Sequence, residues 1–295
     1  MNTVLETSNL SKNYGSVQAL NQVNLQLEAG KIYGLLGRNG AGKTTLLNLL
    51  TSRIYSPVGS FSLFGEPGVD NAAALARICY MPEKNLFPVN MRVNEILRVA
   101  EQFYPNYDRA CADALCRQFH LDPRKKYKAL SRGYESILRI VIGLASRAEI
   151  TIFDEPVLGL DAAVRDQFYQ TLIRDYSDSP RTFILSTHLI DESADIFEDV
   201  IILKDGQVIA CEPSEQLRLS ALHLSGRAEA AEAFIREQQV KVLNREAIGQ
   251  LASYAIHGPL TREQRDLAIG AGLDLAPVSL QKLFIYMTES DEREG

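Results

Sequence analysis

The sequence predicts an α/β protein in which a parallel-sheet domain is followed by a smaller α+β domain. A glycine-rich segment at residues 37–44 lies between an apolar run at 32–36 and a helix-like run at 45–50. This order of strand, loop and helix is typical of a parallel sheet with crossover helices. A second short apolar run, residues 150–153, ends in two adjacent carboxylates. After about residue 214, short strands and helices alternate in a different order, which predicts the second domain.

The composition is that of a globular protein of 295 residues, of which 46% are hydrophobic and 23% are charged. A chain of this length can bury a full α/β core and still form one small domain. The formal net charge of −6 argues against a general nucleic-acid binder, which normally carries a basic patch, so no nucleic acid is expected as a partner. The four cysteines show no C-x-x-C spacing, which indicates reduced thiols in the cytoplasm.

The first part of the chain predicts two subdomains beside the parallel sheet. Residues 4–28 alternate in polarity as paired antiparallel strands do, and residues 63–65 are expected to end the same sheet. Between residues 86 and 147 the apolar spacing becomes helical, with helices predicted around residues 93–100 and 110–119. These patterns predict an antiparallel β subdomain and a helical subdomain.

The parallel sheet is expected to resume at residue 148. A helix is predicted over residues 162–173, an apolar strand over 182–185, and a hairpin with an Asp-Gly turn over 203–208. The main domain is therefore assigned to residues 1–213.

The second domain is assigned to residues 214–288, and residues 289–295 form an acidic tail. Its predicted elements are a strand at 221–224, a helix at 227–238, strands at 240–243 and 252–256, a helix at 261–269 and a strand at 273–275. This β-α-β-β-α-β order predicts a small ferredoxin-like domain. Apolar residues at 280–287 predict one more amphipathic helical segment.

The glycine-rich segment matches the phosphate-binding pattern G-x-x-x-x-G-K-[ST]. Its residues are Gly37, Arg38, Asn39, Gly40, Ala41, Gly42, Lys43 and Thr44, and Thr45 follows in the helix. The glycines allow consecutive backbone N–H groups to surround phosphates, and Lys43 can reach the outer phosphate oxygens. The hydroxyl of Thr44 is placed to ligate Mg²⁺ at the positive end of a helix. The segment therefore predicts that a nucleotide is bound.

The two carboxylates that follow residues 150–153 are Asp154 and Glu155. Adjacent acids at the carboxyl end of a buried parallel strand can divide two tasks in nucleotide hydrolysis. Asp154 is expected to hold the Mg²⁺, and Glu155 to orient and deprotonate the attacking water.

Three further motifs accompany these two. They are Leu130-Ser131-Arg132-Gly133-Tyr134, Gly159-Leu160-Asp161 and Ser186-Thr187-His188. In this order and at these spacings, the chain resembles the ATP-binding subunit of ABC transporters over about residues 4–212. The resemblance implies a phosphate-loop, RecA-like ATPase core with an antiparallel β subdomain and a helical subdomain. It also implies ATP and Mg²⁺ as the bound species.

The resemblance also implies a role for each motif within one chain. Tyr14 stands where the family places an aromatic ring that stacks on adenine, and residues 37–45 bind the phosphates and the metal. The segment Tyr80-Met81-Pro82-Glu83 occupies the loop that senses the γ-phosphate, where Glu83 offers a metal ligand. Glu155 and His188 are the catalytic residues, and His188 is the γ-phosphate switch.

Other motifs imply that each active site needs two chains. Ser131, Arg132 and Gly133 belong to the signature that closes over ATP bound by the other protomer, and Asp161 lies in the loop that crosses the dimer axis. Simpler structural roles remain open for three residues. Tyr14 could be a core aromatic, His188 could merely end a strand, and Asp161 could cap the helix at 162–173.

Two motifs depart from the family's pattern, at three positions. Glu83 stands where the family usually has Gln, which adds a negative charge beside the γ-phosphate. Arg132 and Tyr134 replace Gly and Gln of the usual Leu-Ser-Gly-Gly-Gln signature. Intact Glu155 and His188 favour a working ATPase with altered coupling, and a degenerate site is the alternative.

The predicted partners are a second copy of the chain and a separate integral membrane permease. The longest apolar stretch, residues 137–145, is interrupted by Arg139 and is far shorter than a membrane span, so the protein is expected to lie on the cytoplasmic face of the cell membrane. The signature variant and the ending at residues 278–284 resemble the branch that exports antibiotics, lantibiotics and peptide toxins. The alternatives are a slow regulatory or immunity subunit, or a soluble ABC ATPase that acts outside transport. The second domain is expected to regulate turnover or pair in the dimer, or else to act as a stabilising cap.

Overall fold

The computed structural model describes residues 2–55, 58–84 and 87–289. The chain divides into two compact units. The first unit runs to Leu189 and includes Ile196–Cys211, and the second comprises Ile190–Asp195 and the chain from Glu212 onward. The short segment Ile190–Asp195, which the sequence analysis placed in the main domain, is therefore grouped with the second unit.

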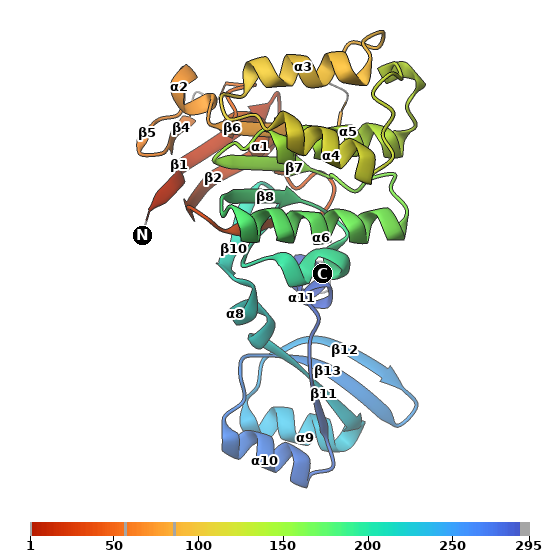
Figure 1. Cartoon of the computed structure of the whole chain (residues 1–295). Helices are drawn as coiled ribbons and strands as arrows, with labels where there is room; N and C mark the ends of the chain where they lie inside the picture. Colours follow the sequence, from red (N-terminus) through yellow and green to blue (C-terminus); the bar gives the residue numbers. More distant parts are fainter. Residues whose placement is uncertain (1, 56–57, 85–86, 290–295) are drawn as a thin grey trace. The chain divides into compact units, whose positions relative to one another are not determined.

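A six-stranded sheet forms the centre of the first unit, with the order β10-β9-β3-β8-β7-β6 (Figure 1). Its strands are β3 (Ile32–Leu36), β6 (Ile78–Met81), β7 (Ile150–Asp154), β8 (Thr182–Ser186), β9 (Asp199–Lys204) and β10 (Gln207–Pro213). Strand β3 pairs in parallel with β8 and β9, and β7 pairs in parallel with β6 and β8. Every residue of β3, β7 and β8 is buried, as their apolar sequences predict. The carboxyl ends of these three strands consequently lie at one edge of the sheet.

A second, antiparallel sheet has the order β2-β1-β4-β5. Its strands are β1 (Thr3–Tyr14), β2 (Val17–Glu28), β4 (Val58–Leu63) and β5 (Glu66–Pro67). Helix α1 (Lys43–Leu50) contributes Leu46 and Leu50 to a core cluster that also contains Leu5 and Leu27 of this sheet and Leu35 of β3. The antiparallel subdomain predicted at residues 4–28 is present, and α1 joins its core to that of the parallel sheet.

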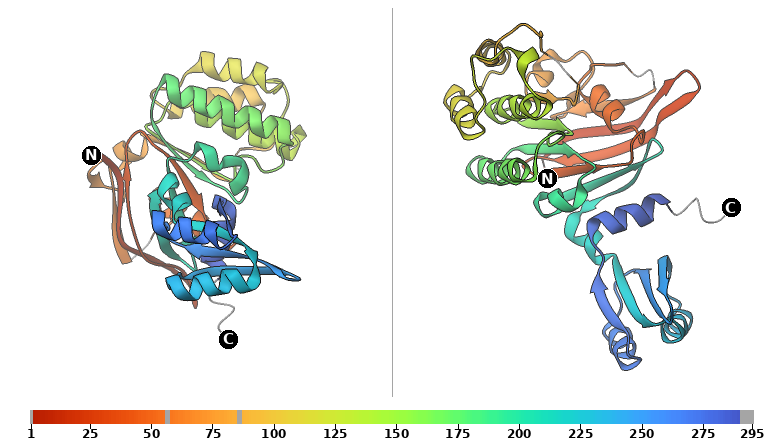
Figure 2. Two further views of the ribbon diagram at one scale, coloured as in Figure 1. Left: turned by 90° about the horizontal axis from the view of Figure 1, so that it is seen from below. Right: turned by 90° about the vertical axis from the view of Figure 1, so that its right-hand side faces the viewer.

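In the described part of the first unit, four longer helices lie beside the two sheets. They are α3 (Val93–Phe103), α4 (Arg109–Gln118), α5 (Arg132–Ala145) and α6 (Ala162–Asp178). Figure 2 shows them on the side of the unit opposite the long strands β1 and β2. The helices predicted at residues 93–100, 110–119 and 162–173 are confirmed. Residue 86, the predicted start of the helical subdomain, lies outside the described residues.

Several short elements escaped prediction because they contain too few residues to show a period. They are α2 (Ala72–Leu75), α7 (Ile190–Ser193), α8 (Ser214–Leu219) and the 3₁₀ turns Tyr127–Ala129 and Ala194–Ile196. One assignment was wrong. Tyr80 and Met81 were placed in a loop with Pro82 and Glu83, but both are buried residues of strand β6. An apolar strand beside β7 is favoured there because both of its faces are covered.

A close contact at Gly34 provides a test of the central sheet. A Cβ atom at Gly34 would lie 2.6 Å from the ring of Phe197. Gly34→Ala is therefore expected to lower the free energy of unfolding by about 1–3 kcal/mol through overpacking. Gly270→Ala is the control, because a Cβ there meets nothing within 4 Å. Thermal unfolding of both variants measures the difference, and an equal midpoint for the two would contradict the packing.

The second unit is an antiparallel sheet with the order β12-β13-β11-β14. Its elements are β11 (Ala221–Arg227), α9 (Ala228–Gln238), β12 (Val242–Ile248), β13 (Leu251–His257), α10 (Arg262–Gly270) and β14 (Asp274–Pro277). This is the predicted ferredoxin-like order. Thr261 begins α10 by a capping box with Gln264. Phe234 of α9 and Ala268 of α10 share a core with Leu224 and Ile256 of the sheet.

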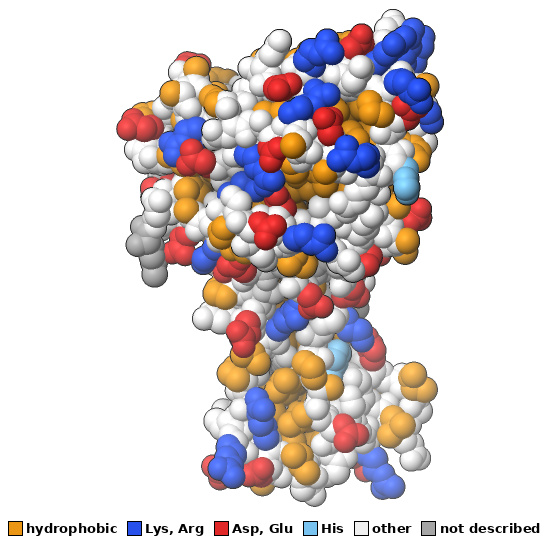
Figure 3. Space-filling model, in the orientation of Figure 1, with side chains coloured by type: hydrophobic (Ala, Val, Ile, Leu, Met, Phe, Trp, Pro, Cys, Tyr) orange, Lys and Arg blue, Asp and Glu red, His pale blue; other side chains and the backbone are white. Residues whose placement is uncertain are grey.

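The last helix, α11 (Leu280–Glu289), packs against α7 and α8. The predicted tail beyond Glu289 lies outside the described residues. Figure 3 shows hydrophobic side chains on the surface of the second unit. Among the large hydrophobic residues that the structure describes, Ile248 at the end of β12 is the most exposed, at 87%. Leu251 pairs with it across the hairpin and is also exposed.

Candidate nucleotide site

The phosphate loop connects β3 to α1 with a tightly curved backbone. Gly40 and Gly42 have φ values of 86° and 106°, in the left-handed region that favours glycine. A Cβ atom at Gly42 would lie 2.5 Å from the backbone oxygen of Ala19. The N–H groups of the first turn of α1 have no acceptor within the helix, so they can donate to an anion at its N-terminus. The loop is therefore shaped for phosphate by its backbone.

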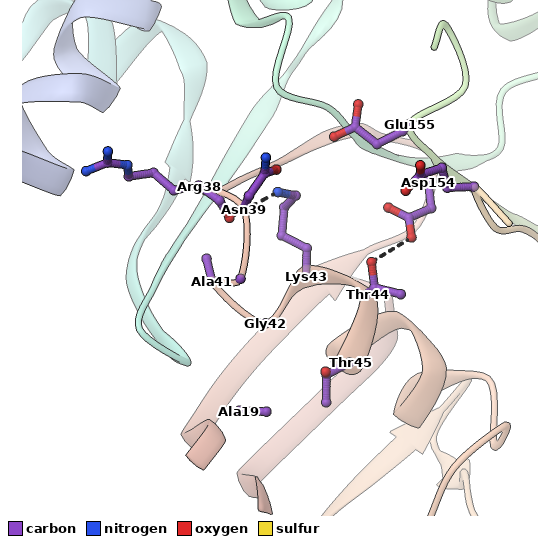
Figure 4. Close-up of a pocket in the computed structure, with 12 residues that line it drawn as sticks. Ala19, Arg38, Asn39, Ala41, Gly42, Lys43, Thr44, Thr45, Asp154 and Glu155 are labelled. Carbon is purple, nitrogen blue, oxygen red and sulfur yellow. Dashed lines mark hydrogen bonds between the residues drawn. The ribbon is translucent and has the colours of Figure 1, made fainter. Parts of the chain in front are cut away.

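Lys43 is buried, with 8% of its surface exposed, and its Nζ donates to the backbone oxygen of Gly37 at 2.6 Å. Burial lowers the pKa of Lys43, while the carboxylates of Glu155, Asp154 and Glu83 raise it. Figure 4 shows the Lys43 side chain in the space between the loop and the two acids Asp154 and Glu155. The cation is thus held by a backbone carbonyl of the loop itself.

A pocket brings together residues from three separate strand ends. Its lining consists of Ala19, Arg38, Asn39, Gly40, Ala41, Gly42, Lys43, Thr44, Thr45, Glu83, Asp154 and Glu155. The loop follows β3, Glu83 follows β6, and the two adjacent acids follow from β7. Parallel pairing of the strands places these segments at one edge, which explains how residues so distant in sequence meet.

The hydroxyl of Thr44 donates to Oδ2 of Asp154 at 3.0 Å. Asp154 is 2% exposed, and the Tyr80 hydroxyl donates to the same oxygen at 3.4 Å. Hydroxyl and carboxylate oxygens are the ligands that Mg²⁺ prefers, so Thr44, Asp154 and the nearby Glu83 fit this metal. The sequence analysis placed Tyr80 in the γ-phosphate-sensing segment but did not predict its contact with Asp154. Burial and this contact raise the pKa of Tyr80 and keep it a hydrogen-bond donor.

Glu155 and His188 are in direct contact, with 2.8 Å between Oε2 of Glu155 and Nδ1 of His188. Glu155 has a φ of 51°, in the left-handed region. This conformation is energetically unfavourable for residues other than glycine. Its backbone N–H donates to the oxygen of Ser186 at 2.9 Å, which holds the turn in place. Burial raises the pKa of Glu155, and the hydrogen bond from His188 opposes that rise. The two predicted catalytic side chains therefore form one hydrogen-bonded pair.

The signature residues lie apart from this pocket. Among the described residues, its lining includes neither Ser131 nor Arg132 nor Gly133. Ser131 caps α5, where its hydroxyl accepts from the N–H of Tyr134 at 3.4 Å. A Cβ atom at Gly133 would lie 2.8 Å from the backbone oxygen of Gly159. The signature is therefore packed on the loop that precedes Asp161.

The structure also bears on the simpler structural roles of two residues. Asp161 caps helix α6, since its carboxylate accepts from the N–H of Val164 at 2.9 Å. Tyr14 is 50% exposed at the end of β1, so the alternative of a core aromatic is wrong. The centroid of its ring lies 5.4 Å from Nζ of Lys12, which is a cation–π distance.

The model of the ABC transporter family matches residues 20–158, a range that contains the phosphate loop, the signature and both carboxylates. Residues 20–158 therefore form an ABC transporter domain. The predicted family and the predicted ATP hydrolase class are thereby confirmed.

Known ABC proteins are similar to this chain beyond the core motifs. The ATP-binding protein YtrB of Bacillus subtilis is 26% identical over 96% of this chain and 97% of its own length. The bacitracin transport ATP-binding protein BcrA of Enterococcus faecalis is 29% identical over 77% of this chain and 73% of its own length. The second relative agrees with the predicted resemblance to the antibiotic exporter branch.

A solved structure supports the fold of the first unit. A dimeric, post-hydrolysis ATP-binding cassette bound to ADP and phosphate superposes with a TM-score of 0.63, at 23% identity. It covers 71% of this chain and 98% of its own length. None of the helices in the described ranges combines the length and the apolar character that crossing a bilayer requires.

Proposed function

We propose that this ABC protein is one of two identical subunits that bind ATP between them and drive a separate membrane permease. The pairing of Glu155 with His188 beside the phosphate loop carries the proposal, because it supplies a base next to the γ-phosphate position. A signature outside the lining of its own chain's pocket supports completion of each site by a second copy.

Each residue of the site has a proposed task. Lys43 leaves the oxygen of Gly37 and binds the β- and γ-phosphates. Glu155 accepts a proton from the attacking water, and His188 holds the carboxylate and reports the γ-phosphate. Thr44, Asp154 and Glu83 hold Mg²⁺, which neutralises charge on the phosphates when it is bound.

Further assignments complete the proposed site between two copies. The adenine ring stacks on Tyr14, while Ser131, Arg132 and Gly133 contact ATP held by the partner, and Asp161 lies near the dimer axis. The protein is peripheral on the cytoplasmic face of the membrane, where it is attached through the permease. Residues 214–288 form an accessory domain that regulates turnover or pairs with its twin.

Acidification is expected to reduce ATP turnover. In a plot of rate against pH, the fall on the acid side (the acid limb) is expected at a higher pH than an ordinary glutamate would give. Glu155 must be unprotonated to accept a proton, and burial raises its pKa, so turnover falls as the pH drops through that raised value. In His188→Ala the hydrogen bond that lowers this pKa is lost, and the acid limb is expected to move further up. Steady-state rates against pH measure both, with His120→Ala as the control. An unmoved limb in His188→Ala would contradict this pairing.

Mixing two inactive variants tests whether sites are shared between copies. Lys43→Ala disables the phosphate loop, and Ser131→Glu places a negative charge where the signature faces the partner's phosphates. A mixed dimer has one site with both lesions and one with neither. Equal mixing is therefore expected to restore about a quarter of the wild-type ATPase rate under random pairing of equal subunits. A mixture as inactive as its components would show that sites are not shared.

The proposed cargo class is amphipathic peptides, toxins or antibiotics. The likeness to a bacitracin transport protein supports it. Cells that lack this gene are expected to become more sensitive to peptide antibiotics, and a wild-type copy, but not Glu155→Gln, to restore resistance. Unchanged sensitivity to such compounds would count against this cargo.

A slow regulatory or immunity subunit is the second candidate, and the carboxylate of Glu83 in the pocket favours it. An additional negative charge there opposes the charge of ATP and favours a tightly held metal. If the protein is such a slow subunit, Glu83→Gln is expected to raise ATP turnover several-fold. Equal turnover in Glu83→Gln and the wild type would remove the reason for this candidate.

A further inference from the structure

A buried arginine lies outside the roles described so far. Arg139 stands in the middle of α5, where Leu138, Ile140 and Val141 are fully buried, and it is itself only 6% exposed. Burying a guanidinium costs free energy unless its donors are satisfied, and an aliphatic side chain would fill this position without that cost. The presence of a cation at this buried position therefore points to a polar role for Arg139.

The guanidinium of Arg139 binds the segment that carries Glu83. One terminal nitrogen donates to the backbone oxygens of Pro82 at 2.7 Å and of Glu83 at 2.5 Å. The other donates to the hydroxyl of Ser136 at 2.7 Å, one turn earlier in α5. Arg139 thus fixes the backbone of a pocket residue to the helix that begins with the signature.

The contact continues to the loop between Glu155 and Asp161. The hydroxyl of Ser136 donates to the backbone oxygen of Leu158 at 2.7 Å. Through Arg139 and Ser136, three segments that each carry a proposed site residue are joined by hydrogen bonds within the first unit. A chain of such bonds between rigid elements can hold the relative positions of those elements.

Charge provides a second argument. Burial lowers the pKa of Arg139, and the groups that favour its cation are, in decreasing order, Tyr127, Glu135, Glu83 and Asp154. In the pocket, Glu83 adds a negative charge beside Asp154 and Glu155. A buried positive charge behind the loop offsets this addition without occupying the space of the nucleotide.

We propose that Arg139 is a positioning residue that holds the Glu83 loop against the signature helix and offsets the charge of Glu83 toward the nucleotide. This inference rests on the proposed function of the pocket. On this inference Glu83 and Arg139 act together. The positive charge of Arg139 reduces the repulsion between the Glu83 carboxylate and the phosphates of ATP.

Local proteolysis tests the positioning without any nucleotide. Lys84 is exposed and follows Glu83 directly. Replacing Arg139 by Met keeps the packing volume but removes the donors to the loop, so trypsin is expected to cleave after Lys84 about tenfold faster, as expected for the loss of charged hydrogen bonds. Arg139→Lys keeps the positive charge but not the planar guanidinium with its several donors. It is expected to give an intermediate rate of cleavage.

Arg181→Met is the matched control for this experiment. Arg181 is 7% exposed and also donates to a backbone oxygen, that of Leu144, but it contacts α6 through Asp175. Its loss is expected to lower thermal stability without selective cleavage after Lys84. Equal cleavage in the wild type and Arg139→Met, or equal acceleration in Arg181→Met, would overturn the positioning role.

A double-mutant cycle on ATP binding tests the charge pairing. Affinity for a fluorescent ATP analogue is measured with Mg²⁺ and with a chelator. Arg139→Met is expected to weaken binding about tenfold in the chelator and less with Mg²⁺, and Glu83→Gln in the same chain is expected to restore most of the loss. Additive effects of Glu83→Gln and Arg139→Met would overturn the pairing. If the wild type bound no ATP, the proposed function would fail, whereas the proteolysis result would still stand.

Discussion

Glu155→Gln is expected to reduce the rate of ATP hydrolysis by about 10²- to 10⁴-fold, the range that a general base contributes. The substituted amide keeps the size of the side chain and can still bond to Nδ1 of His188, which lies 2.8 Å from the carboxylate in the wild type. The amide cannot accept a proton from the attacking water. Affinity for ATP is expected to be nearly unchanged, because the phosphates are held by the loop and Lys43.

Phosphate release and binding of a labelled ATP measure the two effects of this substitution separately. Glu149→Gln is the matched control. Glu149 precedes the same strand, β7, and pairs with Arg77 at the surface, at the opposite edge of the sheet. It is expected to keep nearly the full hydrolysis rate. A Glu155→Gln protein that hydrolysed ATP as fast as Glu149→Gln would remove Glu155 from the proposed chemistry.

Lys43→Met is expected to weaken ATP binding by about 100-fold, because charged hydrogen bonds to phosphate are lost in a buried position. The 8% exposure of Lys43 means that water cannot replace the ammonium group easily. Asp154, Glu155 and Glu83 would remain in the pocket with less positive charge to balance them.

Titration with a fluorescent ATP analogue measures the affinity of Lys43→Met. Lys31→Met provides the control, since Lys31 lies just before β3, at the other end of that strand, and pairs with Glu28 and Asp199. Removing these two ion pairs is expected to leave ATP affinity unchanged. Equal affinities of the two variants would contradict the role of Lys43.

The central strands and the phosphate loop could be predicted because their signals are local. Strands β3, β7 and β8 are short, mostly apolar runs whose residues are all buried, and their length favours strands over helices. The pattern at residues 37–44 requires glycines where the backbone has positive φ, as Gly40 and Gly42 do. Because these strands were predicted to be parallel, their carboxyl ends were expected at one edge of the sheet.

Other features depend on contacts between distant segments and could not be read from local patterns. Tyr80 was placed in a loop, yet it belongs to β6 and its hydroxyl reaches Asp154. Arg139 was seen only as an interruption of an apolar run, although the interruption is the one sequence signal of its contacts with the Glu83 loop. Side-chain hydrogen bonds across such separations leave no period in the sequence.

The segment after His188 illustrates the same limit for domain boundaries. Residues 190–195 follow strand β8 in sequence, but the structure groups them with the second unit. Helix α11 packs on α7, and the N–H of Asp191 donates to the side-chain oxygen of Gln281 at 3.4 Å. A boundary drawn only from the change of strand pattern near residue 214 could not include so short a segment.

The association state of Glu155→Gln with nucleotide tests the central claim, that ATP is bound between two copies. Sedimentation velocity is measured without nucleotide, with ADP and Mg²⁺, and with ATP and Mg²⁺, and Lys43→Met/Glu155→Gln serves as the control that cannot hold phosphate. A dimer that forms only with ATP, and only when Lys43 is present, is the predicted result. A monomer under all conditions, or a dimer that forms equally with and without nucleotide, would contradict it.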